Sequence, residues 1–146
     1  YTPMSVRPSV AQAAMIGDPV SFPKVSRLVN DFFADRFMAV ELEEQEIIEG
    51  MLIANRHGHV VCTQGGESIA GLKKAVSMGI VKKDQVVVVD STSQQLKFSN
   101  FQTMYFNDSF PPEYEIKAKQ DYINKPVQME ASSDKIAEFL RLKRKG

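Results

Sequence analysis

The sequence predicts an α/β fold, built from βαβ units around a parallel sheet and followed by a C-terminal helical extension. Four consecutive valines, Val86–Val89, make a run too apolar for a strand with one wet face, which is typical of a central strand in a parallel sheet. Short apolar segments alternate with helical spacings through residues 37–92, the pattern of parallel βαβ units. We therefore expect an α/β domain over residues 1–100 and an extension over 101–146 that ends in a helix.

Composition limits the class of protein. The chain has 146 residues, 43% of them hydrophobic, with 18 basic and 18 acidic side chains, which suits one globular domain. Zero net charge argues against a nucleic-acid partner, and no apolar run approaches the roughly 20 residues of a membrane span. A single cysteine, Cys62, excludes an internal disulfide and indicates a reducing compartment, so we expect a cytoplasmic protein. With two histidines and one cysteine, we expect no metal site.

The N-terminal third is predicted to form an irregular entry, a turn and a helix. Residues 1–14 show few periodic cues, and Ile16-Gly17-Asp18-Pro19 reads as a turn because glycine permits unusual backbone angles and proline restricts the residue before it. Ser21 can cap the next helix. The apolar residues of that helix have the spacing of one buried face: Val25, Leu28, Val29, Phe32 and Phe33.

Two further helices are predicted between short strands at residues 36–40 and 59–62. The first covers Glu41 to Arg56, with an acidic start and a basic end that complement the helix dipole and with Gly58 as its stop. The second opens from the turn at residues 63–68 and is ended by Gly79. Their inward residues are Ile47, Ile48, Met51 and Leu52 in the first helix and Ile69, Leu72 and Val76 in the second.

The end of the valine run is the strongest candidate for a site. Open α/β sheets bind ligands beyond the carboxyl ends of their strands, and the valines give way there to Asp90, Ser91, Thr92 and Ser93. A hydroxyl at this place can bond a ring nitrogen or carbonyl. An equally weighted interpretation is a hydroxyl that bonds its own turn backbone.

Other chemistry-bearing residues have plainer interpretations. The turn at residues 63–68 could receive an anion at a helix start, but an ordinary turn is the more frequent case. Cys62 is expected to be a small buried hydrophobe, and His57 and His59 to be surface residues beside Gly58. Lys24, just inside a helix start, is expected to be exposed and unreactive.

The C-terminal part carries weaker patterns. Residues 107–112 read as a loop, and residues 114–128 show no clear period. A last helix is expected to be capped by Ser133 and to end with the basic residues 143–145. Its expected inward residues are Ile136, Phe139 and Leu140.

Three stretches in order resemble the threonine synthases, pyridoxal-phosphate enzymes of the tryptophan-synthase-β-like (type II) fold. Residues 13–21 resemble the Ile-Gly-(Asp/Asn)-Pro-(Val/Ala)-Ser turn of that family. Residues 62–72 stand where the family has a Cys-Pro-His-Thr-Gly turn and an alanine-rich helix. Residues 79–98 are similar to its Val-Val-Val-Ser-Thr-Ala-His-Gly-Leu-Lys-Phe segment. Residues 101–146 match only as a C-terminal extension.

The resemblance implies a lyase of threonine biosynthesis that converts O-phospho-L-homoserine and water into L-threonine and phosphate. The family's threonine at the pyridine nitrogen of pyridoxal 5′-phosphate falls on Thr92, with Ser91 beside it. The turn Ile16-Gly17-Asp18-Pro19 would pack near the cofactor ring. The chain departs from the family at Ser93-Gln94-Gln95, where Ala-His-Gly is expected, and at Gln64, where the family has histidine.

The family's Schiff-base lysine and phosphate-gripping loop lie in its N-terminal part, and nothing here matches them. The resemblance therefore implies a C-terminal portion of the large pyridoxal-phosphate domain, without catalytic residues of its own and inactive alone. Its expected partners are the N-terminal remainder, the phosphorylated amino-acid substrate and a second copy in a homodimer. Two alternatives stay open: another pyridoxal-phosphate lyase or dehydratase of the same fold, and a non-catalytic binding module derived from such an enzyme.

Overall fold

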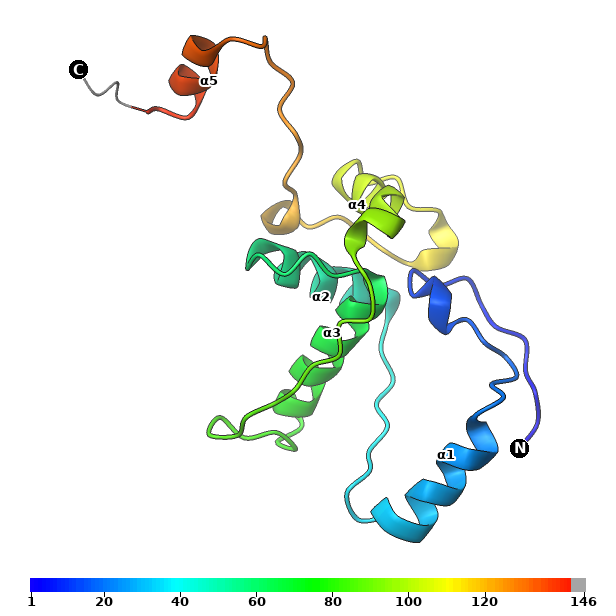
Figure 1. Ribbon diagram of the computed structural model, residues 1–146. Helices are drawn as coiled ribbons and strands as arrows, with labels where there is room; N and C mark the ends of the chain where they lie inside the picture. Colours follow the sequence, from blue (N-terminus) through cyan, green and yellow to red (C-terminus); the bar gives the residue numbers. More distant parts are fainter. Residues whose placement is uncertain (143–146) are drawn as a thin grey trace.

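The computed structural model describes residues 1–142, and these form helices joined by loops (Figure 1). The five α-helices in this part are α1 (Phe22–Leu28), α2 (Glu44–Arg56), α3 (Thr63–Ser77), α4 (Ser99–Phe106) and α5 (Ser133–Phe139). A π-helical turn, η2 (Val29–Phe33), continues α1. Short 3₁₀ turns lie at η1 (Gln12–Ala14), η3 (Gln95–Phe98), η4 (Pro112–Tyr114) and η5 (Gln120–Tyr122).

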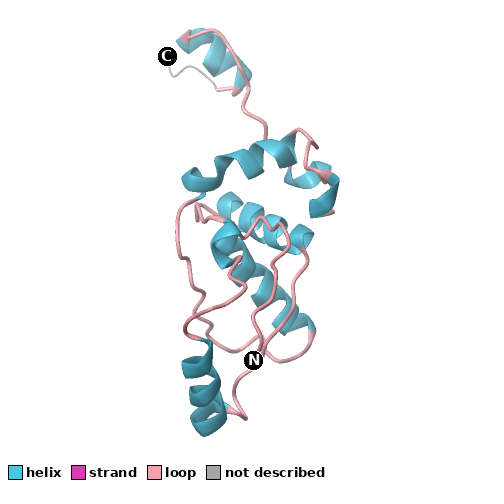
Figure 2. Ribbon diagram, turned by 90° about the vertical axis from the view of Figure 1, so that its right-hand side faces the viewer, coloured by secondary structure: helices cyan, strands magenta, loops and turns pink. Residues whose placement is uncertain are grey.

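The predicted parallel sheet is wrong. Across residues 1–142 no strand is present, and the only β-type pairing is an isolated antiparallel bridge between Val61 and Gln94 (Figure 2). The valine run is extended, but no segment pairs with it, and the side chains of Val86 and Val88 are 98% and 94% exposed. A strand buried on both faces needs neighbours on both edges and cover on both faces, and the described chain supplies neither.

The core is built where α2 crosses α3. Helix α2 begins with a capping box in which Glu43 and Glu46 each bond the backbone of the other, and it buries the apolar face predicted for it. The two helices approach closely at Gly50 and Gly66. A Cβ atom on Gly66 would lie 2.4 Å from the Ile47 carbonyl oxygen. Glycine at both positions therefore lets the two backbones touch.

A C-terminal layer closes this core from the side of α4. Tyr105 is fully buried, and its hydroxyl accepts a hydrogen bond of 3.0 Å from the Lys119 backbone N–H. Phe101 of α4 packs against Phe110 and Tyr114, with ring centroids 6.0 and 6.2 Å away. An ion pair of 2.6 Å between Lys119 and the buried Glu49 ties the same layer to α2.

Two helices stand away from the core, α1 on the N-terminal side and α5 on the C-terminal side (Figure 1). The predicted helix after Ser21 is present, but none of its expected inward residues is buried: Leu28 and Val29 are partly buried, and Val25, Phe32 and Phe33 are exposed. Helix α5 is capped by Ser132 rather than Ser133, and Ile136, Phe139 and Leu140 are exposed rather than inward. The basic residues 143–145 lie outside the described residues. No helix in the described part is long and apolar enough to cross a membrane.

Candidate functional site

A cavity of about 760 Å³ lies between the end of α2, the start of α3 and the extended segment 89–94. We call it the His57–Ser91 cavity. Its body is apolar, with Ile53, Val60, Ile69 and Val89 among the lining side chains. Its polar lining residues are His57, His59, Asp90, Ser91, Ser93 and Gln94.

The two histidines reach the cavity because the chain reverses at the end of α2. Gly58 has φ +86°, a left-handed conformation that glycine adopts without a steric penalty. The His59 N–H donates to the Ala54 carbonyl at 3.0 Å, which folds the chain back over the last helical turn. Both histidines are exposed, as expected from the sequence, yet both line the same cavity.

The opposite wall is the segment after the valines, which the bridge between Val61 and Gln94 holds in place. The Cys62 N–H donates to the Ser93 carbonyl at 3.1 Å. Five residues of this segment line the cavity: Val89, Asp90, Ser91, Ser93 and Gln94.

Thr92 lies on the other side of this segment and is not among the lining residues of the cavity. Its Oγ1 is 3.6 Å from the sulfur of Cys62, which is fully buried, as expected of a small hydrophobe. The structure thus presents the hydroxyl of Ser91, rather than that of Thr92, to the cavity. The cofactor role of Thr92 stays a prediction.

The polar side chains of the cavity have no protein partner among the described residues. Across residues 1–142, the imidazoles of His57 and His59, the Asp90 carboxylate and the hydroxyls of Ser91 and Ser93 make no hydrogen bond or ion pair. This concentrates unused donors and acceptors around an apolar space. Such an arrangement suits a small ligand with a flat apolar body and polar edges.

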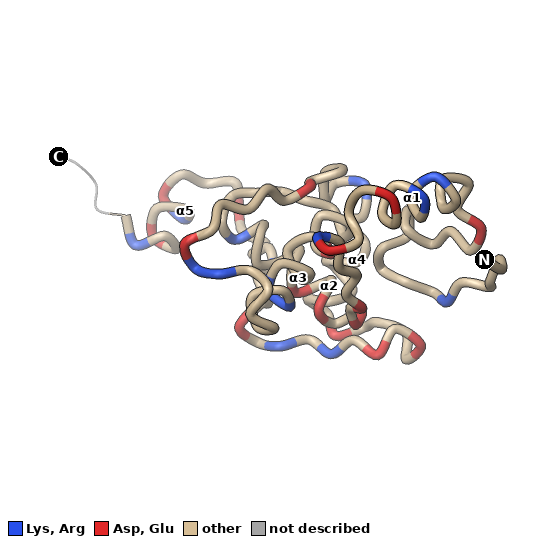
Figure 3. Tube along the Cα trace, turned by 90° about the horizontal axis from the view of Figure 1, so that it is seen from below, with Lys and Arg blue, Asp and Glu red and all other residues tan. Residues whose placement is uncertain are grey.

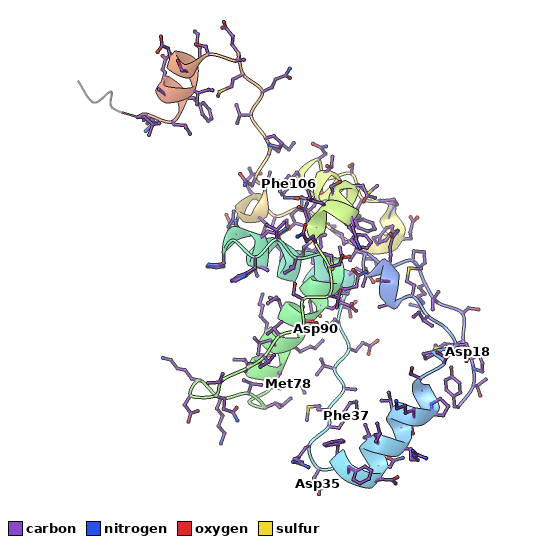
Figure 4. All side chains as sticks on the ribbon, in the orientation of Figure 1. Asp18, Asp35, Phe37, Met78, Asp90 and Phe106 are labelled. Carbon is purple, nitrogen blue, oxygen red and sulfur yellow. The ribbon has the colours of Figure 1, made fainter. Side chains whose placement is uncertain are left out.

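The turn at residues 16–19 is not brought to this cavity. Figure 4 shows Asp18 beside the start of α1 and Asp90 against α3, well apart. Asp18 accepts a hydrogen bond of 2.7 Å from the Tyr1 hydroxyl, and the Gly17 carbonyl accepts one of 3.0 Å from the Met4 N–H. Pro19, the last residue of the turn, leads into α1.

Ile16 of this turn lines a second cavity, of about 560 Å³, which also has Arg7, Glu44 and Glu67 in its wall. Burial, and then the charge of Glu44, raise the pKa of the Glu67 carboxyl above its usual value. Acidic residues lie along this side of the molecule, around α2 (Figure 3). All carboxylates tend to repel an anion, so this cavity is a poorer candidate for a phosphorylated ligand.

The predicted turn at residues 63–68 is the first part of α3, and it is covered. With its amide turned so that the oxygen faces η1, the Gln64 side chain accepts hydrogen bonds from the Gln12 and Ala13 N–H groups at 3.1 and 2.9 Å. Thr63 is fully buried, and its hydroxyl has no partner in the described chain. The start of α3 is therefore packed under η1, which leaves no open place for an anion.

No set of three or more possible metal-ligating side chains occurs in the described residues. The contribution of His57 and His59 to a cavity was missed from the sequence. The available signal was a pair of imidazoles on either side of a helix-stopping glycine, the second of them two residues before Val61 of the bridge.

The comparisons with known proteins point to threonine synthases. No protein-family model matches the chain. Threonine synthase 2, chloroplastic, of Arabidopsis thaliana is 25% identical over 141 residues, covering 97% of this chain and 26% of that protein. Threonine synthase of Methanocaldococcus jannaschii is 33% identical over 90 residues, covering 61% of this chain and 22% of that protein. The chain is thus related in sequence to threonine synthases and spans about a quarter of the length of these relatives.

Proposed function

We propose that this chain forms one wall of the cofactor pocket of a threonine synthase, which makes L-threonine and phosphate from O-phospho-L-homoserine and water. The observation that carries the proposal is the relationship to threonine synthases along 97% of the chain. The His57–Ser91 cavity supports it, because hydroxyls stand there at the rim of an apolar space of about 760 Å³. Both named relatives point to this reaction rather than to another lyase.

The lining of the cavity fits part of pyridoxal 5′-phosphate. Its apolar side chains suit the face of a pyridine ring, and the Ser91 hydroxyl, with Thr92 next to it, can bond a ring nitrogen. No lysine lines the cavity among the described residues, so no side chain there can bind the aldehyde covalently. When bound, the cofactor supplies the electron sink of the reaction.

In this proposal the chain's own residues orient and enclose rather than catalyse. Ser91 holds one edge of the ring, and Ile53, Val60 and Ile69 keep water from its face. A neutral hydroxyl bonded to the pyridine nitrogen does not force that nitrogen to be protonated. The missing lysine and phosphate anchor come from an N-terminal remainder, and without it we expect no turnover.

The exposed apolar side chains support such a partner. Val20, Val86 and Val88 are 97%, 98% and 94% exposed, and several phenylalanines of α1 and η2 are also accessible. Large exposed apolar surfaces mark places where another polypeptide binds. A homodimer remains a second partner that we propose from the resemblance.

The experiment is reconstitution from two pieces. The chain is produced together with an N-terminal segment of the Methanocaldococcus jannaschii enzyme that stops before the matching region. Threonine is measured after addition of O-phospho-L-homoserine and pyridoxal 5′-phosphate. We expect threonine from the pair and none from either piece alone.

Two matched pairs of variants test the hydroxyls. Ser91→Ala and Thr92→Val should lower the rate, whereas Ser77→Ala and Thr103→Val should not, because those hydroxyls bond helix carbonyls away from the cavity. A pair that co-purifies but makes no threonine would contradict the proposal. Equal rates for the test and control variants would remove the role given to Ser91 and Thr92.

A further inference from the structure

Helix α5 is closed at both ends, but its apolar face is uncovered. The Ser132 hydroxyl accepts a hydrogen bond from the Lys135 N–H at 3.5 Å, which caps the start of the helix. At the other end the Leu142 N–H donates to the Ala137 carbonyl at 2.9 Å, with Arg141 in the left-handed conformation at φ +52°. This is the long bond of a Schellman motif, which turns the chain back on the helix.

The uncovered face is made of large apolar side chains. Ile136, Phe139, Leu140 and Leu142 are 41%, 53%, 55% and 62% exposed. An isolated helix shorter than about 12 residues is marginal in water, and helices in proteins are stabilised mainly by packing of their apolar face. Residues 123–130 form an extended tether that holds α5 away from the core (Figure 1). A capped helix on a tether with an open apolar face suits docking on another surface.

The charge of the C-terminal segment indicates the sign of that surface. Residues 133–146 hold five of the 18 basic side chains of the chain and two of its 18 acidic ones. This segment therefore has an excess of three positive charges, and the rest of the chain has an equal negative excess. Four of the basic residues follow the helix, at positions 141 and 143–145. Within α5 itself Lys135 is outnumbered by Asp134 and Glu138, so the helix lacks the basic polar face of a membrane-surface helix.

A surface of the opposite sign lies on the same molecule, between the start of α2 and η4. It is a cavity of about 650 Å³, which we call the acidic cavity. Five glutamates and one cation line it: Glu41, Glu43, Glu44, Glu113, Glu115 and Arg7. Its wall also contains the half-buried Leu42 and Tyr114, which give it an apolar part.

Three carboxylates of the acidic cavity are available to a partner. Glu43 belongs to the capping box of α2, and Glu44 accepts a hydrogen bond from the Val10 N–H. The carboxylates of Glu41, Glu113 and Glu115 make no hydrogen bond or ion pair among residues 1–142.

We propose that α5 of one copy of this chain, with the basic residues that follow it, docks on the acidic cavity of a second copy. The apolar face of α5 then covers Leu42 and Tyr114, and the cations meet carboxylates that have no partner of their own. In this structure α5 and η4 lie on opposite sides of α4, so α5 does not reach the cavity of its own copy (Figure 1). Exchange of a tethered element between identical copies is a low-cost route to a closed dimer. The inference does not rest on the proposed function.

The test exchanges charge between two variants of the full chain. The cavity variant, Glu41→Lys/Glu113→Lys/Glu115→Lys, keeps the basic tail. The tail variant, Lys143→Glu/Arg144→Glu/Lys145→Glu, keeps the acidic cavity. The control variant reverses three exposed lysines outside both surfaces, Lys82→Glu/Lys83→Glu/Lys97→Glu, and has the same net charge as the tail variant. Sedimentation velocity over a range of concentrations measures the association of each variant and of equimolar mixtures.

The wild type should dimerise, and less tightly in about 1 M salt, where the screening length falls to about 3 Å. The cavity and tail variants should each associate at least about ten-fold more weakly than the wild type and the control variant. Their mixture should dimerise, because each basic tail then meets an acidic cavity. The cavity variant mixed with the control variant should associate at least about ten-fold more weakly than this mixture, although its net charges are equally opposite. Phe139→Ser, which changes an exposed side chain, should weaken the wild-type dimer by about ten-fold.

Each outcome decides the proposal. A wild type that stays monomeric up to about 1 mM would overturn it. So would a dimer that Phe139→Ser leaves unchanged, or a mixture of the cavity and tail variants that associates no better than the mixture with the control. Without self-association, binding to phosphatidylserine vesicles that Phe139→Ser abolishes would assign α5 to a lipid surface instead. Co-purification with the N-terminal segment that the tail variant loses would assign it to that segment. Phe139→Ser and the salt dependence decide the matter if circular dichroism shows a charge variant to be unfolded.

Discussion

Replacement of Gly66 by alanine tests the crossing of α2 and α3, on which the rest of the molecule is built. A Cβ atom there would lie 2.4 Å from the Ile47 carbonyl oxygen and 2.9 Å from the Met51 nitrogen. Both atoms belong to the backbone of α2, so no side-chain rotation relieves the overlap. The relation is reciprocal, because a Cβ atom on Gly50 would lie 2.4 Å from the Gly66 carbonyl oxygen.

The magnitude follows from two opposing terms. Ordinary contact begins at 3.4 Å, so the helices must separate by about 1 Å, and overpacking of this kind costs about 1–3 kcal/mol. Alanine is a better helix former than glycine by about 1 kcal/mol. Because rigid backbone causes the clash, the cost should be in the upper part of its range, leaving a net loss of about 1–2 kcal/mol. The melting temperature should then fall by roughly 3–8 °C.

Gly71→Ala is the matched control on the same helix. The nearest atom to its added Cβ would be Val40 Cγ2, at 3.9 Å, which is ordinary contact. This variant should gain about 0.5–1 kcal/mol from helix propensity alone. Urea unfolding of both variants and the wild type, followed by circular dichroism at 222 nm, measures the difference. An unfolding midpoint of Gly66→Ala at or above that of the wild type would refute the close crossing.

Three further changes test individual groups. Burial and Glu44 raise the pKa of Glu67, so the fold disfavours its ionised form. Glu67→Gln should therefore raise the urea unfolding midpoint at pH 7 and should give no gain below the ordinary pKa of 4.5. An equal gain at both pH values would disprove this. The bond to Glu49 raises the pKa of Lys119, so the ion pair stabilises the fold until the pH rises through that raised pKa. Lys119→Ala should therefore lower the urea unfolding midpoint at pH 8, and the difference from the wild type should disappear well above pH 10.5. A difference that persists there would show that Lys119 stabilises by packing. Thr63→Val should stabilise the chain by about 1 kcal/mol in urea unfolding, since it removes a buried hydroxyl without a partner in the described residues, whereas a loss would reveal a bond to that hydroxyl.

The helical part of the fold was predictable because its signals are local. The spacing of Ile47, Ile48, Met51 and Leu52 predicts the buried face of α2. Gly79, with φ +72°, follows the C-cap residue Met78 and ends α3 as expected. What the spacing does not contain is the mutual fit of the two helices. The glycines that permit their close approach look like turn and breaker residues when they are considered one at a time.

The parallel sheet was not predictable from the valines alone. The preference of valine for strands reflects packing on a pleated, half-buried surface, and it does not supply the neighbouring strand. Among residues 1–142 no segment pairs with Val86–Val89, so the run stays extended and exposed. Helix α4, which buries Phe101 and Tyr105 one turn apart, was not predicted from the sequence.

A cavity lies where the sequence predicts a site, and its role in binding stays a prediction. The transition from valines to hydroxyls predicts a ligand beside residues 90–93, and Ser91 and Ser93 do line a cavity there. Ser91, and not its neighbour Thr92, lines that cavity, and the period of an extended chain does not explain this because Asp90 and Gln94 line the cavity as well. His57 and His59 line the opposite wall of the cavity because the backbone reverses direction at Gly58, at the end of α2. No local sequence pattern relates that helix end to residues 90–93.

The polar groups of this chain fall into two sets, those that stabilise the fold and those that remain available to a ligand. Glu43, Glu46 and Glu49 are each satisfied by a cap, an ion pair or both, and these bonds fix α2 and the layer packed on it. The groups around the His57–Ser91 cavity stabilise nothing within the described residues, yet they are held by the same helices. Loosening the crossing by Gly66→Ala should therefore lower threonine formation by the reconstituted pair as well as stability, because Gly65, the neighbour of Gly66, lines the cavity. Gly71→Ala, which leaves the crossing intact, should stabilise the fold and leave that rate unchanged.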